Sequence, residues 1–231
     1  MFHSKSHLFF DLDHTLWDYE ASSNETLQEL WVEYKLDSKG VPLNSFVGKF
    51  SEVNEELWRR LHAGEINKDV IQNDRFPSIL SALALEDNAM ATDMQQQYIH
   101  VCPTKPYLID GAMELLESVS GRYGLHIITN GFDEIQGIKL RSGGIGHFFE
   151  EVITSGVAGY QKPDKQIFDF AMKKTNAKVE DSLMIGDNPI SDIEGAFKAG
   201  IDQVFFNPDD QQCPITPTLE IKSLRELMEH V

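Results

Sequence analysis

Two aspartates close the first apolar segment of the chain, and their spacing suggests metal chemistry. Asp11 and Asp13 follow a short apolar run that begins at His7 and is typical of a buried strand. In an extended chain, residues two apart face the same side, so the two carboxylates would lie together. Unpaired carboxylates repel each other, and a divalent cation relieves that repulsion. The structural alternative is a turn or a helix cap that uses aspartate.

A second pair of acids follows another apolar run near the C-terminal end of the chain. Asp187 comes directly after residues 182–186, and Asp192 lies five positions further on. Gly186 allows the backbone to turn tightly at the tip of this predicted strand. We interpret Asp187 as a functional carboxylate, whereas Asp192 alone fits equally well as an ordinary residue of the helix that follows.

Polar groups of a different kind lie between the two acid pairs. Thr129 and Asn130 leave an apolar run just before a helix, where backbone N–H groups such as that of Gly131 can hold phosphate oxygens. Lys162 precedes Pro163, which disfavours helix at the lysine and pre-sets the start of the next helix. Taken singly, a plain turn and a surface lysine are the simpler interpretations of these two segments.

Short apolar strands and amphipathic helices alternate along the segments that carry these residues. Strands are predicted at residues 7–11, 125–129, 152–154, 182–185 and 203–206. Helices are predicted near 112–119 and 164–174, with Asp110 and Asp164 as their caps, and a terminal helix is expected from Leu219. This alternation predicts an α/β fold with a Rossmann-like, doubly wound parallel sheet, in which each site residue lies at a strand end.

The stretch between the first strand and the second half of the chain has a different pattern. Apolar residues recur at helical spacing over residues 17–104, with no convincing strand, which predicts an inserted all-α helical cap domain of about four helices. The predicted domains are therefore a core made of residues 1–16 and 105–231 and a cap made of residues 17–104.

Composition limits the classes of partner. The 231 residues include 37 acidic and 20 basic ones, so the formal net charge is −17, which disfavours nucleic-acid polymers and anionic membranes. No apolar run is long enough to span a bilayer, and the N-terminal segment lacks the features of a signal peptide. Cys102 and Cys213 form neither a CxxC pair nor a zinc-binding spacing. We expect a cytoplasmic protein.

Taken together and in order, the motifs resemble those of the haloacid dehalogenase (HAD) superfamily of phosphohydrolases. The matching stretches are FDLDHTLWD, IITNGF, YQKPDKQIFDFA and IGDNPISDIEGAFKAGI. The helical insertion after the first motif looks like the superfamily's helical cap of the first type. The resemblance implies a core with strand order 3-2-1-4-5, a mobile cap, and Mg²⁺-dependent phosphoryl transfer through an aspartyl-phosphate.

The resemblance also implies roles for the four acids. Asp11 would be the nucleophile and a metal ligand. Asp13 would be the general acid/base, with its backbone carbonyl on the metal as well. Asp187 would be the second metal carboxylate, and Asp192 would orient the lysine or reach the metal through water. To protonate a leaving group, Asp13 would need a raised pKa in the free enzyme, which we take as a hypothesis.

The remaining motif residues would handle the phosphoryl group. Thr129 and the backbone after it, including Gly131, would hold the transferring group, with Asn130 nearby. Lys162 would neutralise the nucleophile and the phosphoryl oxygens. Positive charge is needed here because a carboxylate that attacks a phosphate dianion must overcome the repulsion between like charges.

The first motif narrows the substrate class. True dehalogenases lack the second aspartate, because a halide leaving group needs no proton, so Asp13 favours a phosphatase over a dehalogenase. The segment FFDLDHTLWDYEASSNETL and the length of the cap resemble the noncanonical pyrimidine nucleotidases, which are 5′-nucleotidases. We therefore expect a small phosphate monoester as substrate, specifically a nucleoside 5′-monophosphate. The alternatives are phosphoglycolate or sugar phosphate hydrolysis, a phosphomutase, and a protein that only binds phosphorylated ligands.

Two further features bear on the substrate. His14 stands where the superfamily often has glycine, and it would serve as a turn residue or contact the leaving group. Several aromatic residues could stack on a base, although their helical spacing favours a place in the core of the cap. They are Trp17, Tyr19, Phe46, Phe50 and Trp58.

Overall fold

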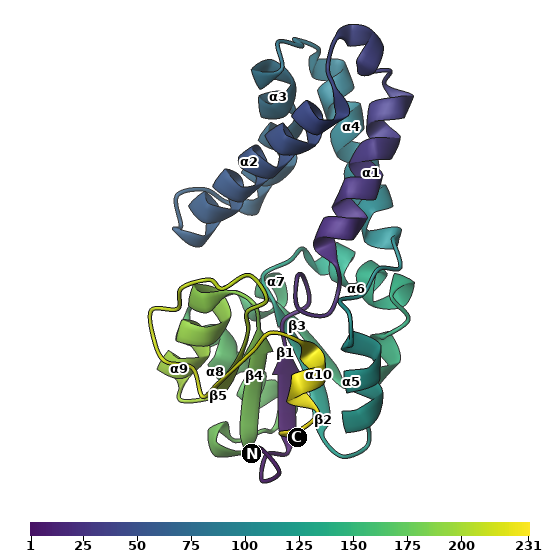
Figure 1. Ribbon diagram of the computed structural model, residues 1–231. Helices are drawn as coiled ribbons and strands as arrows, with labels where there is room; N and C mark the ends of the chain where they lie inside the picture. The colour runs from purple at the N-terminus through teal and green to yellow at the C-terminus, as the bar shows by residue number, and fades with distance from the viewer. The chain divides into compact units, whose positions relative to one another are not determined.

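The chain folds into two structural units. The computed structural model describes residues 1–231 and divides them into an α/β unit, Met1–Tyr19 with Pro106–Val231, and a helical unit, Glu20–Lys105 (Figure 1). The boundaries predicted from the sequence lie at 16/17 and 104/105. None of the helices combines the length and the apolar character that crossing a membrane requires.

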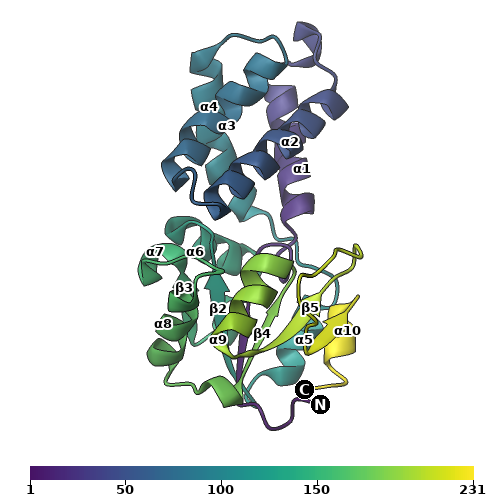
Figure 2. The same ribbon diagram turned by 90° about the vertical axis from the view of Figure 1, so that its left-hand side faces the viewer.

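The α/β unit is built on one sheet of six parallel strands in the order β3-β2-β1-β4-β5-β6. The strands are β1 His7–Phe10, β2 Gly124–Thr129, β3 Glu151–Thr154, β4 Ser182–Gly186, β5 Asp202–Phe206 and β6 Leu219–Ile221. The helices are α5 Ala112–Val119, α6 Asp133–Ser142, α7 Ser155–Ala158, α8 Lys165–Thr175, α9 Gly195–Ala199 and α10 Leu224–Leu227. Figures 1 and 2 show α8 and α9 on one face of the sheet and α5 and α10 on the other, which confirms the predicted doubly wound fold.

Burial explains why the strands are almost continuously apolar. Phe9, Ile128 and Met184 come from three adjacent strands and pack against Ile167 and Phe168 of α8, and each of the five is completely buried. In a parallel sheet that is covered on both faces, the side chains on both sides of each strand are buried, so the strands do not alternate between apolar and polar residues. The sheet therefore forms a rigid base for the loops at its carboxyl edge.

The register of the sheet aligns the ends of the strands that carry the motifs. Phe10 of β1 pairs with Ile127 of β2 on one side and with Ile185 of β4 on the other. The residues that follow these positions therefore emerge at the same edge of the sheet. In open α/β sheets this carboxyl edge is where ligands bind.

The C-terminal segment differs from the sequence prediction. The helix expected from Leu219 is wrong: Leu219–Ile221 forms β6, which lies parallel to β5, and α10 begins only at Leu224 after the cap residue Ser223. Ile221 is 1% exposed, whereas Leu219 is only partly buried and Glu220 is exposed. Two apolar residues separated by a glutamate are too few for periodicity to separate a strand from a helix.

Of two predicted helix caps, one is wrong and the other is confirmed in position only. Asp110 does not cap α5, because its carboxylate pairs with the Arg225 guanidinium, and the position before the helix is Gly111 with a φ of 84°. Asp164 occupies the cap position of α8, but its side chain accepts no hydrogen bond there. A cap prediction identifies a suitable residue type, and a cation from a distant segment can engage the carboxylate instead.

The helical unit contains four α-helices, as predicted. They are α1 Tyr19–Glu33, α2 Leu43–His62, α3 Lys68–Ala82 and α4 Asn88–Val101. Phe46 and Phe50 of α2 are at most 2% exposed, and their rings contact Phe76 of α3. Both residues therefore belong to the core of this unit, whereas Trp58 remains partly exposed.

A pair of histidines in the sheet makes a testable prediction about stability. His126 of β2 is 1% exposed, and its Nε2 lies 3.1 Å from Nδ1 of His7 on β1. Burial, with a smaller contribution from the charge of His7, lowers the pKa of His126 from 6.5 to about 4. Between these values the unfolded chain binds the proton and the folded chain does not. Stability is therefore lost as the pH falls through this window, by up to about 3 kcal/mol.

The pH dependence of unfolding tests this prediction. Denaturant unfolding of the wild-type chain should weaken more between about pH 7 and pH 5 than that of His126→Phe, which keeps an aromatic ring but cannot titrate. His3→Gln serves as the control, because His3 is exposed. Identical pH profiles for the wild type and His126→Phe would show that His126 is not held neutral.

Candidate active site

The predicted site residues converge at the carboxyl edge of the sheet. Asp11 follows β1, Thr129 ends β2 and Asp187 follows β4, the three strands that lie side by side in the sheet. Lys162 comes from the loop before α8, and Asp192 comes from the π-helical turn Pro189–Glu194 before α9. All of these residues lie in the α/β unit.

Lys162 is the central cation of the site. Its Nζ donates hydrogen bonds to Asp11 Oδ1 and to Asp192 Oδ1, both at 2.6 Å, and to the Ile128 carbonyl oxygen at 2.8 Å. Lys162 is only 1% exposed. Burial alone would lower its pKa, but the charges and hydrogen bonds of Asp11 and Asp192 outweigh burial and raise it. The lysine is therefore held as an ammonium, in contrast to an ordinary surface lysine.

Three carboxylates surround this single ammonium. Oxygens of Asp11, Asp187 and Asp192 all lie within 4.8 Å of one another. Burial and then the charge of Asp192 raise the pKa of Asp187 to about 7, and burial is also the main cause that raises the pKa of Asp11. One lysine does not compensate for three carboxylates, two of them buried and the third partly buried. A cluster of hard oxygen donors with negative charge to spare fits a divalent cation such as Mg²⁺.

Asp13 belongs to a separate arrangement. Its side chain does not join the acid cluster, because Lys139 Nζ donates to Oδ1 at 2.5 Å and Gln136 Nε2 donates to Oδ2 at 3.0 Å. Burial opposes ionisation of Asp13, but the charge and hydrogen bond of Lys139 and the hydrogen bond of Gln136 prevail and lower its pKa. The hypothesis of a raised pKa in the free enzyme is therefore wrong, because it did not include a lysine 126 residues away in the chain.

The side chains of Thr129 and Asn130, at the end of β2, have different hydrogen-bond partners. The Thr129 hydroxyl accepts hydrogen bonds from the Gly131 N–H at 3.0 Å and from Gln136 Nε2 at 2.9 Å. With two donors on its oxygen, the hydroxyl hydrogen is left to donate to a further acceptor. Asn130 instead exchanges hydrogen bonds with the Lys162 backbone, at 2.8 Å to N–H and 2.9 Å to the carbonyl. Its side chain thus fixes the position of the lysine.

Sequence reasoning missed three residues of this site. Gln136 and Lys139 both contact Asp13, and the Thr15 hydroxyl donates to Asp187 Oδ1 at 2.9 Å. The spacing of Gln136 and Lys139 places them on one face of a helix that directly follows a motif, which is the available signal. That signal does not show which face of the helix meets the first motif.

His14 has the backbone conformation that explains why glycine is common at its position. Its φ is 64°, in the left-handed region, and its ring contacts Tyr19 at 4.9 Å between centroids. The residue therefore does form part of the turn that carries the first motif, and its side chain is exposed.

Gly186 is required by the close approach of Asp192. A Cβ at this position would lie 2.4 Å from Asp192 Oδ2, and the carboxylate cannot easily retreat, because Lys162 and the Asn188 N–H hold it. Gly186→Ala should therefore cost about 1–3 kcal/mol of stability. The matched control is Gly48→Ala, where a Cβ meets no atom within 4 Å and the helix should gain stability. Thermal unfolding measures the stability of both variants. A Gly186→Ala variant as stable as the wild type would contradict the close packing of Asp192 against Gly186.

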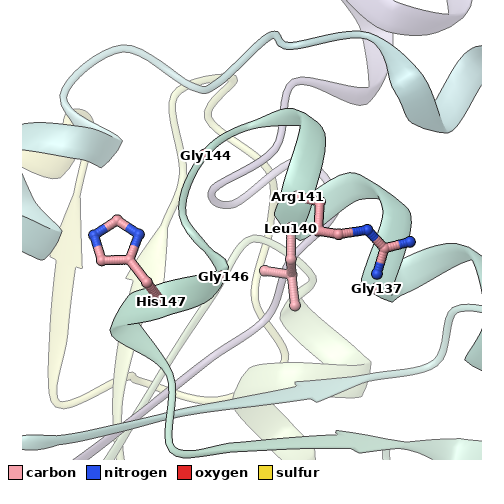
Figure 3. A pocket seen from close by; sticks show the side chains of 6 residues that line it. All are labelled: Gly137, Leu140, Arg141, Gly144, Gly146 and His147. Atoms are coloured by element: carbon pink, nitrogen blue, oxygen red, sulfur yellow. The ribbon is translucent and has the colours of Figure 1, made fainter.

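A hollow of about 410 Å³ lies on the same unit but contains none of the predicted site residues. Its walls come from α6 and the turn after it, as Figure 3 shows. The lining residues are Gly137, Leu140, Arg141, Gly144, Gly146 and His147. The carboxylate cluster at the sheet edge, and not this hollow, is therefore the candidate active site.

Known proteins share this architecture over almost the whole chain. Residues 5–200 match the haloacid dehalogenase-like hydrolase family. The HAD-hydrolase YfnB of Bacillus subtilis is 33% identical over 225 residues, covering 95% of this chain and 92% of YfnB. A crystal structure of YfnB bound to magnesium superposes with a TM-score of 0.87 at 31% identity and covers 98% of both chains.

Two further relatives are phosphatases. The pyrimidine 5′-nucleotidase PynA of Streptococcus pneumoniae is 31% identical over 227 residues, covering 96% of this chain and 93% of PynA. A glyceraldehyde 3-phosphate phosphatase of Methanothermobacter thermautotrophicus is 39% identical over 205 residues, covering 87% of this chain and 85% of that enzyme. Together with the family match, they confirm the resemblance drawn from the motifs: the chain belongs to the haloacid dehalogenase-like hydrolases.

Proposed function

We propose that this protein is a Mg²⁺-dependent phosphatase that hydrolyses a small phosphate monoester through an aspartyl-phosphate on Asp11. One observation carries the proposal. A buried aspartate at the end of the central strand is bound to a buried ammonium, Lys162, beside two further carboxylates. A protein that only binds phosphorylated ligands does not need a carboxylate in a position where it repels the ligand.

Asp11 would attack phosphorus while Lys162 and the metal reduce the repulsion between the anions. Mg²⁺ held by Asp11, Asp187 and the Asp13 backbone carbonyl would supply positive charge against the phosphoryl oxygens. Lys162 is already placed for its part, because its ammonium lies 2.6 Å from the attacking carboxylate. Asp192 would keep the lysine in that position through their 2.6 Å contact, which favours the orienting role of Asp192.

Asp13 would transfer protons to and from the reacting oxygens. As the bond from phosphorus to the leaving oxygen breaks, Asp13 would give that oxygen a proton. It would later take a proton from the water that attacks the aspartyl-phosphate, which releases phosphate and restores the Asp11 carboxylate. Its lowered pKa suits the second step directly. For the first step, Asp13 must keep the proton from the preceding turnover or receive one from the substrate monoanion.

The Thr129 hydroxyl would hold the transferring phosphoryl group, and the Gly131 N–H would contribute by fixing that hydroxyl, because it donates to the Thr129 oxygen. The Thr129 hydroxyl has a hydrogen to donate, because two N–H groups already occupy its oxygen. Donors that are fixed in advance stabilise developing charge without reorganising during the reaction. The engagement of the Asn130 side chain by the Lys162 backbone makes Asn130 an indirect contributor to phosphate binding.

We propose a pyrimidine nucleoside 5′-monophosphate as the substrate. Support comes from the first motif and cap length in the sequence and from the similarity to PynA over almost the whole of both chains. Glyceraldehyde 3-phosphate is the second candidate, because the phosphatase of that name is 39% identical over most of its length.

Phosphate release from a substrate panel tests both parts of the proposal. Hydrolysis of p-nitrophenyl phosphate should require Mg²⁺ and stop on its chelation. Among UMP, dUMP, dTMP, AMP, ribose 5-phosphate, phosphoglycolate and glyceraldehyde 3-phosphate, the pyrimidine nucleotides should have the highest kcat/KM. No metal-dependent release from any compound would refute the phosphatase, whereas preference for a sugar or triose phosphate would refute only the nucleotidase assignment.

A further inference from the structure

Two side chains on one face of α6 contact the first motif. Gln136 and Lys139 lie three positions apart on this helix, and both donate hydrogen bonds to the carboxylate of Asp13. Each oxygen of Asp13 therefore has its own donor: Oδ1 accepts from the ammonium at 2.5 Å, and Oδ2 accepts from the amide at 3.0 Å. Two donors on two oxygens fix the plane of the carboxylate as well as its position.

The ammonium of Lys139 is itself confined. It lies 4.6 Å from the centre of the Trp17 ring, and Trp17 is completely buried. The backbone ties this tryptophan to the turn that carries Asp13, because the His14 N–H donates to the Trp17 carbonyl at 3.0 Å. With only 9% of the Lys139 side chain exposed, the ammonium exchanges much of its hydration for a carboxylate and an aromatic face.

Gln136 connects Asp13, the proposed general acid/base, with Thr129, the proposed phosphoryl-binding group. Its Nε2 donates to Asp13 Oδ2 at 3.0 Å and to the Thr129 hydroxyl at 2.9 Å. Gln136 is fully buried, and a Cβ at Gly131 would collide with it at 1.5 Å, so the glycine makes room for the amide. The same helix face thus holds both the group that would move protons and the group that would hold the phosphoryl oxygens.

We propose that Lys139 is a positioning residue that aims the Asp13 carboxyl at the leaving-group oxygen of the substrate. The inference rests on the proposed phosphatase function and adds a residue to it. As the bond between phosphorus and the leaving oxygen breaks, the Asp13 proton moves to that oxygen and Asp13 becomes a carboxylate. Lys139 holds this carboxylate in place until it takes a proton from the attacking water. Without Lys139, Asp13 turns away from that oxygen, and transfer to a poor leaving group slows.

The dependence on the leaving group separates this role from a structural one. The value of kcat/KM reports only the steps up to release of the alcohol, and p-nitrophenolate leaves without needing a proton. Lys139→Met should therefore lower kcat/KM by about 10²-fold for UMP, whose leaving oxygen must be protonated, and only by a few fold for p-nitrophenyl phosphate. Lys139→Arg, which keeps a cationic donor, should restore most of the loss for UMP.

Arg141→Met is the matched control, because it removes an exposed cation from the same helix. It should leave both substrates unchanged. If the methionine variant unfolds, Lys139→Ala, which also removes the donor, carries the same comparison, and thermal unfolding monitors the folding of every variant.

Equal losses for the two substrates, or no loss for either, would overturn the positioning role. A wild-type protein that is active on p-nitrophenyl phosphate but shows equal losses in the variants would leave the phosphatase function intact and remove only the inference. A wild-type protein that hydrolyses neither ester would refute the phosphatase and the role of Lys139 together.

Discussion

Asp11→Asn is expected to reduce phosphate release by at least about 10⁴-fold, because an amide cannot replace the carboxylate nucleophile. The substitution preserves the size of the side chain, and it removes one of the three carboxylates that crowd the site. Lys162 keeps Asp192 as a partner, so the fold should persist. Steady-state phosphate release and thermal unfolding, measured side by side, distinguish lost chemistry from lost structure.

The control for this variant is Asp209→Asn, which makes the same chemical change at an exposed position in the loop after β5. It should retain wild-type turnover. If Asp11→Asn also retained substantial turnover, a different nucleophile would operate, and the arrangement around Lys162 would have to be interpreted as structural.

Asp13→Asn should lower turnover by about 10²–10⁴-fold while substrate binding persists, because proton transfer is lost but the phosphoryl-binding groups are unchanged. The amide can neither protonate the leaving oxygen nor take a proton from water. With p-nitrophenyl phosphate, whose leaving group needs no proton, phosphorylation should proceed and hydrolysis of the aspartyl-phosphate should become limiting. A rapid burst of p-nitrophenol followed by slow turnover would report this change.

Two observations would contradict the assignment of Asp13. One is near-wild-type turnover on UMP in the Asp13→Asn variant. The other is a loss of turnover accompanied by a matching loss of substrate binding, measured by calorimetry, which would place Asp13 among the binding groups. Thermal unfolding is needed in parallel, because the amide leaves the Lys139 ammonium without its ion pair.

The sequence predicted those parts of the fold that depend on local pattern. Short runs of three to five residues identified β1 to β5, and the strand order implied by the family resemblance agrees with the structure for these five strands. β6 was missed because the exposed Glu220 separates its two apolar residues, so no apolar run identifies this strand. The cap predicted at Asp110 failed because a suitable residue type does not determine which hydrogen-bond donor it meets. Asp164 does stand at the cap position of α8, but its side chain accepts no hydrogen bond there.

For the site, as for the fold, the sequence predicted what depends on local pattern and missed what depends on contacts between distant segments. Asp11, Asp187 and Thr129 could be placed from sequence because each stands at the end of an apolar strand, and parallel strands bring those ends together. Lys139 could not be placed, because its contact with Asp13 depends on the rotation of α6 about its axis. The predicted direction of the Asp13 pKa was wrong because the prediction included neither the charge and hydrogen bond of Lys139 nor the hydrogen bond of Gln136.

Chemical trapping of the phosphorylated aspartate tests the central claim most directly. The Asp13→Asn variant is mixed with p-nitrophenyl phosphate and Mg²⁺, quenched in acid, and treated with borohydride, which reduces an acyl phosphate of aspartate to homoserine. Peptide mapping by mass spectrometry should find homoserine at position 11 and at no other aspartate, and chelation of Mg²⁺ should abolish it. A burst of p-nitrophenol without homoserine at position 11, or with homoserine elsewhere, would contradict nucleophilic catalysis by Asp11.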